Sequence, residues 1–173
     1  MMQNTEIERK YLVNSDIYLT LATEKHEVKQ GYLCADGIRT VRVRMWDDTG
    51  VLTIKGRGNG VSRFEWEKQI SAEDAEALFE LCQPGRVSKT RYVVPINSPS
   101  KVEGVAAGRG SMIQLNVEVD VFHGENEGLV FAEIELPTED YEFTVPEWLG
   151  KEVTGDPRYY NSYISAHPFN TWS

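Results

Sequence analysis

The sequence predicts a mainly β protein of the α+β class, an eight-stranded antiparallel barrel that is closed and covered by a few helices. Eight segments alternate polar and apolar residues with the period of a strand, and short turns such as Ala35-Asp36-Gly37 join several neighbours. Charged side chains of like sign also recur in pairs on one strand face. The length of 173 residues suits a single domain over 1–173.

Composition excludes several classes of function. The formal net charge of -9 disfavours non-specific nucleic-acid binding, which needs a basic surface. No apolar run reaches the roughly 20 residues of a membrane span, and the first residues lack the basic and apolar regions of a signal peptide. Cys34 and Cys82 make neither a disulfide framework nor a zinc motif. We therefore expect a cytoplasmic protein with no nucleic-acid and no membrane partner.

The predicted elements follow from these patterns. The strands are expected at 6–13, 27–34, 39–46, 51–56, 63–70, 87–96, 112–122 and 129–136. Helices are expected at about 16–23, 71–82 and 158–166. The first of these offers Ile17, Leu19 and Leu21 for packing, and the second has Ser71 as its N-cap and acids in its first turn. Residues 97–111, rich in Gly, Ser and Pro, predict a long loop or an extended hairpin tip.

The first strand carries an unusual face. Period-two alternation places Glu6, Glu8 and Lys10 on one side of it. Burying these charges unpaired would cost several kcal/mol for each ion. A solvated edge strand would explain this stretch if it stood alone. The recurrence of charge pairs on the other strands favours a shared function instead.

A closed barrel with the charged faces inward would form a polar tunnel. Arginine guanidinium groups bind phosphate oxygens through two parallel hydrogen bonds, and lysine ammonium groups bind them as compact positive charges. Paired carboxylates hold hard divalent cations such as Mg²⁺ or Mn²⁺, which neutralise phosphates. The pattern therefore indicates a site for a short polyphosphate with metal ions, and the apolar outer faces would be covered by the helices.

The chain also resembles a known family. Glu6-Ile-Glu-Arg-Lys10 is similar to the ExExK signature of the CYTH superfamily, the triphosphate tunnel metalloenzymes. The likeness continues in order along nearly the whole chain, most closely to the short bacterial members. Its further segments are Gln30-Gly-Tyr-Leu33, Val41-Arg-Val-Arg44, Leu52-Thr-Ile-Lys-Gly56, Glu65-Trp-Glu67, Lys89-Thr-Arg-Tyr92, Glu118-Val-Asp120, Ala132-Glu-Ile-Glu-Leu136, Trp148-Leu-Gly150, Glu152-Val-Thr154 and Arg158-Tyr159.

The resemblance implies roles for individual residues. The triphosphate would be bound by Lys10, Arg42, Arg44, Lys55, Lys89 and Arg91. A set of carboxylates would bind Mg²⁺ or Mn²⁺ and position the attacking water, and not all of them would be direct metal ligands. They are Glu6, Glu8, Glu65, Glu67, Glu118, Asp120, Glu133 and Glu135. Tyr32 and Lys55 would act together in catalysis, because a lysine crowded by other cations can acquire a lowered pKa and transfer protons.

The resemblance implies metal-dependent hydrolysis of a triphosphate, with inorganic tripolyphosphate the favoured substrate. The family also contains class IV adenylate cyclases, which make cyclic AMP from ATP, and thiamine triphosphatases, so ATP and thiamine triphosphate are alternative ligands. A non-catalytic binder of polyphosphate or nucleotide is a third hypothesis. Val117 and the 97–111 segment depart from the family pattern and leave the substrate open. A homodimer is also left open.

Overall fold

The computed structural model describes residues 7–36, 38–58, 63–82, 84–99 and 112–172. Glu6 and the greater part of the predicted 97–111 loop lie outside these residues. The described chain contains nine strands and three α-helices. The strands are β1 (Glu8–Val13), β2 (Glu24–Ala35), β3 (Thr40–Trp46), β4 (Thr49–Gly58), β5 (Arg63–Ser71), β6 (Val87–Pro99), β7 (Met112–Phe122), β8 (Val130–Glu135) and β9 (Leu149–Glu152). The helices are α1 (Tyr18–Leu21), α2 (Ala72–Glu80) and α3 (Asn161–Ala166).

The strands form one hydrogen-bonded series in the order β5-β4-β3-β2-β6-β7-β8-β1-β9. The prediction of a mainly β, antiparallel fold is confirmed, with two corrections. The described series has nine strands, because the short β9 pairs with β1 at Tyr11 and Val13. It also has two ends, β5 and β9, where a closed barrel was predicted. Alternation assigns a face to each strand, but it does not determine whether the first and last strands pair.

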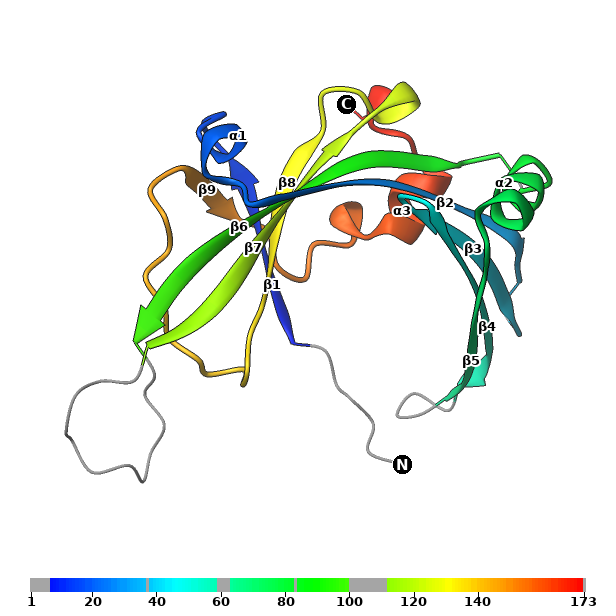
Figure 1. Cartoon of the computed structure of the whole chain (residues 1–173), viewed down its shortest axis with the longest axis horizontal. Helices are drawn as coiled ribbons and strands as arrows, with labels where there is room; N and C mark the ends of the chain where they lie inside the picture. Colours follow the sequence, from blue (N-terminus) through cyan, green and yellow to red (C-terminus); the bar gives the residue numbers. More distant parts are fainter. Residues whose placement is uncertain (1–6, 37, 59–62, 83, 100–111, 173) are drawn as a thin grey trace. The chain divides into compact units, whose positions relative to one another are not determined.

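The described residues divide into two compact units. The described residues of the first unit fall within 1–25, 91–120 and 130–156, and those of the second within 26–90, 121–129 and 157–173. In the first unit, β1 pairs with β8 and places Lys10 opposite Glu133. In the second unit, β2, β3, β4 and β5 form consecutive antiparallel pairs (Figure 1). That the chain is a single domain stays a prediction.

Helix α2 packs on one face of β3 and β4 in the second unit (Figure 1). Its N-cap is Ser71, whose hydroxyl accepts a hydrogen bond from the backbone N–H of Asp74 at 3.0 Å, as predicted. The core beneath the helix contains Val43, Met45, Ala75, Phe79 and Cys82. Gly50 lets the helix approach closely, since a Cβ there would lie 2.4 Å from the Cβ of Ala75.

The side chains that pack at helix α1 differ from those predicted from the sequence. Ile17, Leu19 and Leu21, which were expected to pack, are between 44% and 52% exposed. Tyr18 is buried in their place, with its ring 5.5 Å from that of Tyr92 and 6.4 Å from that of Trp148. A helix of four residues has barely one turn, so a single side chain is enough to anchor it.

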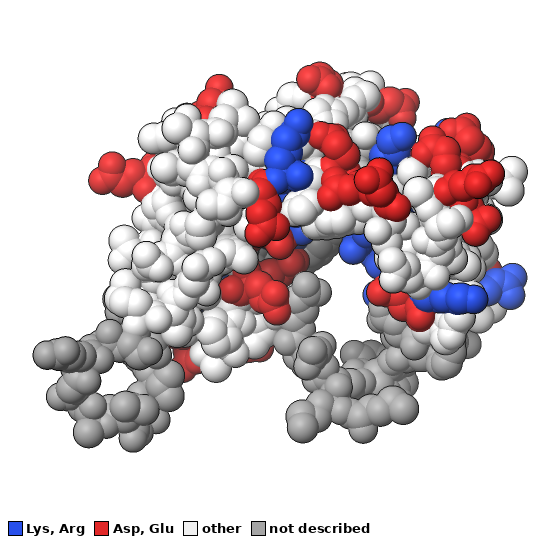
Figure 2. Space-filling model, in the orientation of Figure 1, with Lys and Arg blue, Asp and Glu red and all other residues white. Residues whose placement is uncertain are grey.

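The charged surface agrees with the acidic composition. Figure 2 shows acidic side chains, in red, gathered over α2 at the right. Basic side chains, in blue, are scattered over the same face of the molecule. Helix α2 itself contributes Glu73, Asp74, Glu76 and Glu80. Among the described residues, no helix has the length and apolar character needed to cross a membrane.

Candidate active site

The second unit presents a polar sheet face on the side opposite α2. Val43 and Met45 of β3 pack toward the helix, so alternation turns Arg42 and Arg44 to the other face. The ladders extend this face across neighbouring strands. They pair Gln30 with Arg44, Tyr32 with Arg42, Arg42 with Thr53 and Thr53 with Glu67, and they place Lys55 opposite Glu65.

A buried hydroxyl connects two of the predicted site residues on this face. Arg42 Nη2 donates to Thr53 Oγ1 at 3.3 Å, and Thr53 Oγ1 donates to Glu67 Oε2 at 2.9 Å. Thr53 is fully buried, whereas Glu67 is exposed. The Nε of Arg42 is buried and has no hydrogen-bond partner among the described residues. This guanidinium therefore keeps a donor available for an additional acceptor.

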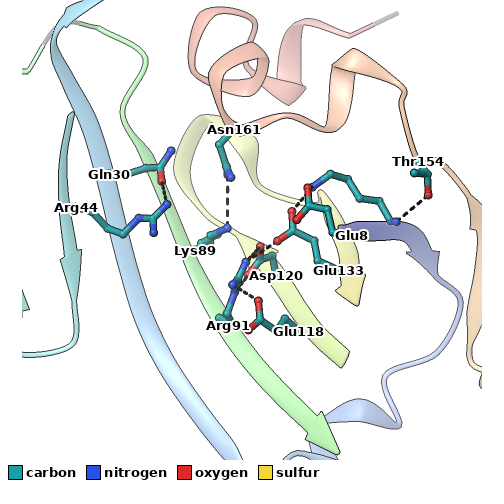
Figure 3. A network of polar contacts seen from close by, with 11 residues as sticks. Glu8, Gln30, Arg44, Lys89, Arg91, Glu118, Asp120, Glu133, Thr154 and Asn161 are labelled. Carbon is teal, nitrogen blue, oxygen red and sulfur yellow. Dashed lines mark hydrogen bonds and ion pairs between the residues drawn. The ribbon is translucent and has the colours of Figure 1, made fainter. Parts of the chain in front are cut away.

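Arg44 makes a second contact on the same face. Its Nη2 donates to Gln30 Oε1 at 3.4 Å (Figure 3). Tyr32 lies two residues beyond Gln30 on β2 and is partly buried, as is Lys55 on β4. The ladders place Tyr32 and Lys55 on the same face, with β3 between them.

Lys89 of β6 is the fourth predicted triphosphate ligand of the second unit, after Arg42, Arg44 and Lys55. It is 3% exposed, with its Nζ 5.3 Å from the centroid of the Phe122 ring. The ammonium also donates to Asn161 Oδ1 at 3.5 Å (Figure 3). Asn161, the first residue of α3, thus contacts Lys89, a residue predicted to bind the triphosphate.

The first unit gathers charged residues around Arg91 (Figure 3). Its Nε and Nη2 donate to the two carboxylate oxygens of Asp120, each at 2.7 Å. Nη2 also donates to Glu133 Oε2 at 2.9 Å, and Nη1 contacts Glu118 Oε2. Burial acts to lower the pKa of Arg91, but hydrogen bonds and charge from Asp120, followed by the charges of Glu133 and Glu118, raise it overall.

Lys10 extends the same cluster. Its Nζ contacts Glu133 Oε1 and lies 2.8 Å from Glu8 Oε1. Burial acts to lower the pKa of Lys10, yet Glu133 and then Glu8 outweigh it and raise the pKa. Glu133 therefore joins the two cations through its two oxygens. Four carboxylates surround two cations, so the cluster carries two formal negative charges in excess.

Four of the eight predicted metal ligands are not among the side chains described for this cluster, and one of them is Glu67, which accepts from Thr53 in the second unit. Glu135 is exposed and lies opposite Glu8 in the β1–β8 ladder. Glu6 lies outside the described residues, and of Glu65 only the backbone position on β5 is described. Among the described side chains, no three His, Cys, Asp or Glu residues are arranged to hold a metal ion as they stand.

Sequence reasoning missed three polar residues that contact the predicted ones. Gln30 contacts Arg44, Thr53 connects Arg42 to Glu67, and Asn161 accepts from Lys89. Gln30 and Thr53 could have been found from alternation, because each lies two residues from a predicted catalytic residue on the same strand. Asn161 carries no such signal, since only the tertiary structure brings α3 to β6.

Comparison with known proteins identifies the family. The CYTH domain matches residues 4–160. An inorganic triphosphatase of Acetivibrio thermocellus is 42% identical over 168 residues, covering 96% of this chain and 97% of that protein. An inorganic triphosphatase of Nitrosomonas europaea is 37% identical over 171 residues, covering 93% and 97%.

A solved structure gives the same result for the fold. The crystal structure of an inorganic triphosphatase superposes with a TM-score of 0.67 at 31% identity, covering 95% of this chain and 97% of that one. The family predicted from the ordered motifs is therefore confirmed, and the chain belongs to the CYTH domain family.

Proposed function

We propose that this protein is a triphosphatase that hydrolyses inorganic tripolyphosphate with the help of a divalent metal ion. One observation carries the proposal: a partly buried face of β2, β3 and β4 presents Arg42 and Arg44, and the buried Nε of Arg42 has no acceptor among the described residues. Guanidinium groups so placed suit a polyanion with many acceptor oxygens. The printed names of two near-full-length relatives support inorganic triphosphate as that anion.

The arginines would stabilise charge during hydrolysis. Phosphoryl transfer passes through a loose transition state in which negative charge is spread over the oxygens of the transferred group. Donors already held in position stabilise that charge without reorganising. The contacts of Arg42 to Thr53 and of Arg44 to Gln30 support such preorganisation. Lys55 and Tyr32, on the same face, are the proposed groups for proton transfer.

The carboxylate cluster of the first unit has the donor chemistry for the metal. The donor atoms of the cluster are carboxylate oxygens, which Mg²⁺ and Mn²⁺ prefer as ligands. Its excess of two negative charges would balance the charge of one divalent cation. Glu8 and Glu133 are the proposed holders, since both carboxylates already contact the same ammonium group of Lys10. A bound divalent ion would supply neutralisation of phosphate charge and activation of water.

The test measures phosphate and pyrophosphate release from tripolyphosphate, with cyclic AMP formation from ATP and hydrolysis of thiamine triphosphate measured in parallel. Each reaction is run with Mg²⁺ and with Mn²⁺. We expect metal-dependent cleavage of tripolyphosphate that falls about 100-fold in Arg42→Ala, as expected when a donor to transition-state charge is removed. Arg39→Ala, at an exposed arginine just before β3, is the matched control and should keep full activity.

Two outcomes would overturn the proposal. Cyclic AMP formation with little tripolyphosphate cleavage would indicate a cyclase. Absence of turnover with all three substrates and both metals would indicate a binding protein.

A further inference from the structure

Gln30 is a polar side chain that the sequence reasoning gave no role. It lies on β2, opposite Arg44 in the ladder, and is 1% exposed. Its neighbour Gly31 faces α2 and the residues after it, since a Cβ there would lie 3.5 Å from Phe79 of α2 and 2.7 Å from Cys82. Alternation therefore turns the Gln30 amide to the same face as Arg42 and Arg44.

The contact with Arg44 fixes the orientation of this amide. Arg44 Nη2 lies 3.4 Å from Gln30 Oε1. A guanidinium has only donors, so the amide must turn its oxygen toward Arg44 and its NH₂ group away from it. Figure 3 shows the Nε2 of Gln30 on the side away from Arg44. That Nε2 is buried and has no hydrogen-bond partner among the described residues.

A buried donor without an acceptor is unfavourable, and an apolar side chain of similar length would avoid the cost. The Nε of Arg42 is likewise a buried donor without a hydrogen-bond partner among the described residues. Arg42 is the diagonal neighbour of Gln30 in the β2–β3 ladder. Two unsatisfied donors thus lie on adjacent strands of one polar face. Both require the same kind of partner, which is an acceptor supplied from outside the described chain.

We infer that Gln30 is a further substrate-binding residue, whose side-chain NH₂ group donates to an oxygen of the phosphate chain. This inference rests on the proposed function for the identity of the anion. In this arrangement the amide has two roles: its oxygen orients Arg44, and its nitrogen adds a neutral donor beside the guanidinium groups. A neutral donor strengthens anion binding without adding repulsion between the neighbouring cations.

The first test is Gln30→Met, which keeps the length of the side chain and removes both amide donors. Without ligand, we expect a melting temperature close to that of the wild type, because removal of the unsatisfied buried donor offsets loss of the acceptor that Arg44 uses at 3.4 Å. With tripolyphosphate, we expect an affinity at least about ten-fold weaker, as for a lost hydrogen bond to a charged group. Calorimetry with tripolyphosphate as the probe measures the affinity, and differential scanning fluorimetry measures the melting temperature.

A second variant covers the case in which Gln30→Met does not fold. Gln30→Glu keeps an acceptor for Arg44 but places a negative charge where the donor was. We expect it to fold and to bind tripolyphosphate more weakly than Gln30→Met. Lys68→Met, at an exposed lysine of β5 that alternation turns away from the face of Glu67, is the control and should bind as the wild type does.

Each outcome bears on the inference separately from the proposed function. Unchanged tripolyphosphate affinity in Gln30→Met or in Gln30→Glu would overturn the inference, and would indicate that a water satisfies the amide. A wild type that binds tripolyphosphate without cleaving it would overturn the proposed hydrolysis and leave the inference standing, provided that both variants bind more weakly. A wild type that does not bind tripolyphosphate would overturn both.

Discussion

Asp120 accepts two hydrogen bonds from Arg91 in a fork, Nε to Oδ1 and Nη2 to Oδ2, each at 2.7 Å. The Asp120 side chain is fully buried, and that of Arg91 is 12% exposed. A pair of this kind adds little net stability over apolar residues, but removing one partner leaves an uncompensated buried charge. The guanidinium of Arg91 is also largely occupied by its carboxylate partners, so its structural role can be tested apart from phosphate binding.

Arg91→Met should therefore lower the free energy of unfolding by about 3–5 kcal/mol, because Asp120 would lose its countercharge. The double variant Arg91→Met/Asp120→Asn should recover part of the loss. Urea denaturation measures both. Arg39→Met, at an exposed ion pair with Asp36, is the control and should unfold at nearly the same urea concentration as the wild type. Equal stability of Arg91→Met and the wild type would contradict the prediction.

The proposed proton transfer by Lys55 can be separated from simple charge attraction. Lys55→Ala should lower kcat for tripolyphosphate by about 10²–10⁴-fold, the range for loss of a general acid or base. Lys55→Arg keeps the positive charge but titrates far above neutral pH, so it should restore KM and not kcat. Lys68→Ala, at an exposed lysine of β5, is the control. A full kcat with a raised KM in Lys55→Ala would limit this lysine to binding.

The carboxylates around Lys10 should govern the response to metal. Glu133→Gln and Glu8→Gln remove negative charge from the cluster, so the Mg²⁺ concentration that gives half of the maximal rate should rise about 10–100-fold. The measurement uses protein stripped of metal by a chelator and then titrated with Mg²⁺. Glu73→Gln on α2 is the control, because it removes an exposed charge outside the cluster. An unchanged Mg²⁺ titration in both variants would place the metal elsewhere.

The close approach of α2 to β4 predicts a defined steric effect. In Gly50→Ala the new Cβ would meet the Cβ of Ala75 at 2.4 Å and Cγ1 of Ile70 at 2.9 Å. Overpacking of this kind should lower the free energy of unfolding by about 1–3 kcal/mol. Adding Ala75→Gly should recover part of the loss by removing the first contact. The prediction fails if Gly50→Ala unfolds at the same urea concentration as the wild type.

Asp47 should make stability depend on pH in the acid range. The hydrogen bond from His26 at 2.7 Å, followed by that from the backbone N–H of Glu27, lowers the pKa of this carboxyl group. A lowered folded-state pKa adds stability that is present above the unfolded value of about 3.9 and is lost as pH falls through the folded value.

Asp47→Asn should therefore be less stable than the wild type at pH 6, with a smaller difference at pH 3. Asparagine also tolerates the φ of +51° at this position, so the backbone is preserved. Thermal unfolding at the two pH values measures the effect, and a difference that grows toward pH 3 would contradict it.

Much of the architecture could be predicted from local patterns. Period-two alternation located the eight predicted strands, and Ser71 with the acids after it located the start of α2. Local patterns failed where only a few residues were involved. The four residues of β9 are too short for a periodic signal, and the apolar residues of α1 gave no indication that Tyr18 would be the buried one.

The sequence by itself determined the family, the strands and the face on which each charged residue lies, because these depend on the order and spacing of residues along the chain. Only the tertiary structure decided which charges meet. It brought Arg91 to Asp120, Glu118 and Glu133, and it left the Nε2 of Gln30 without a partner among the described residues. The physical reason is that strand pairing and burial, rather than sequence distance, determine which donors and acceptors come within bonding range.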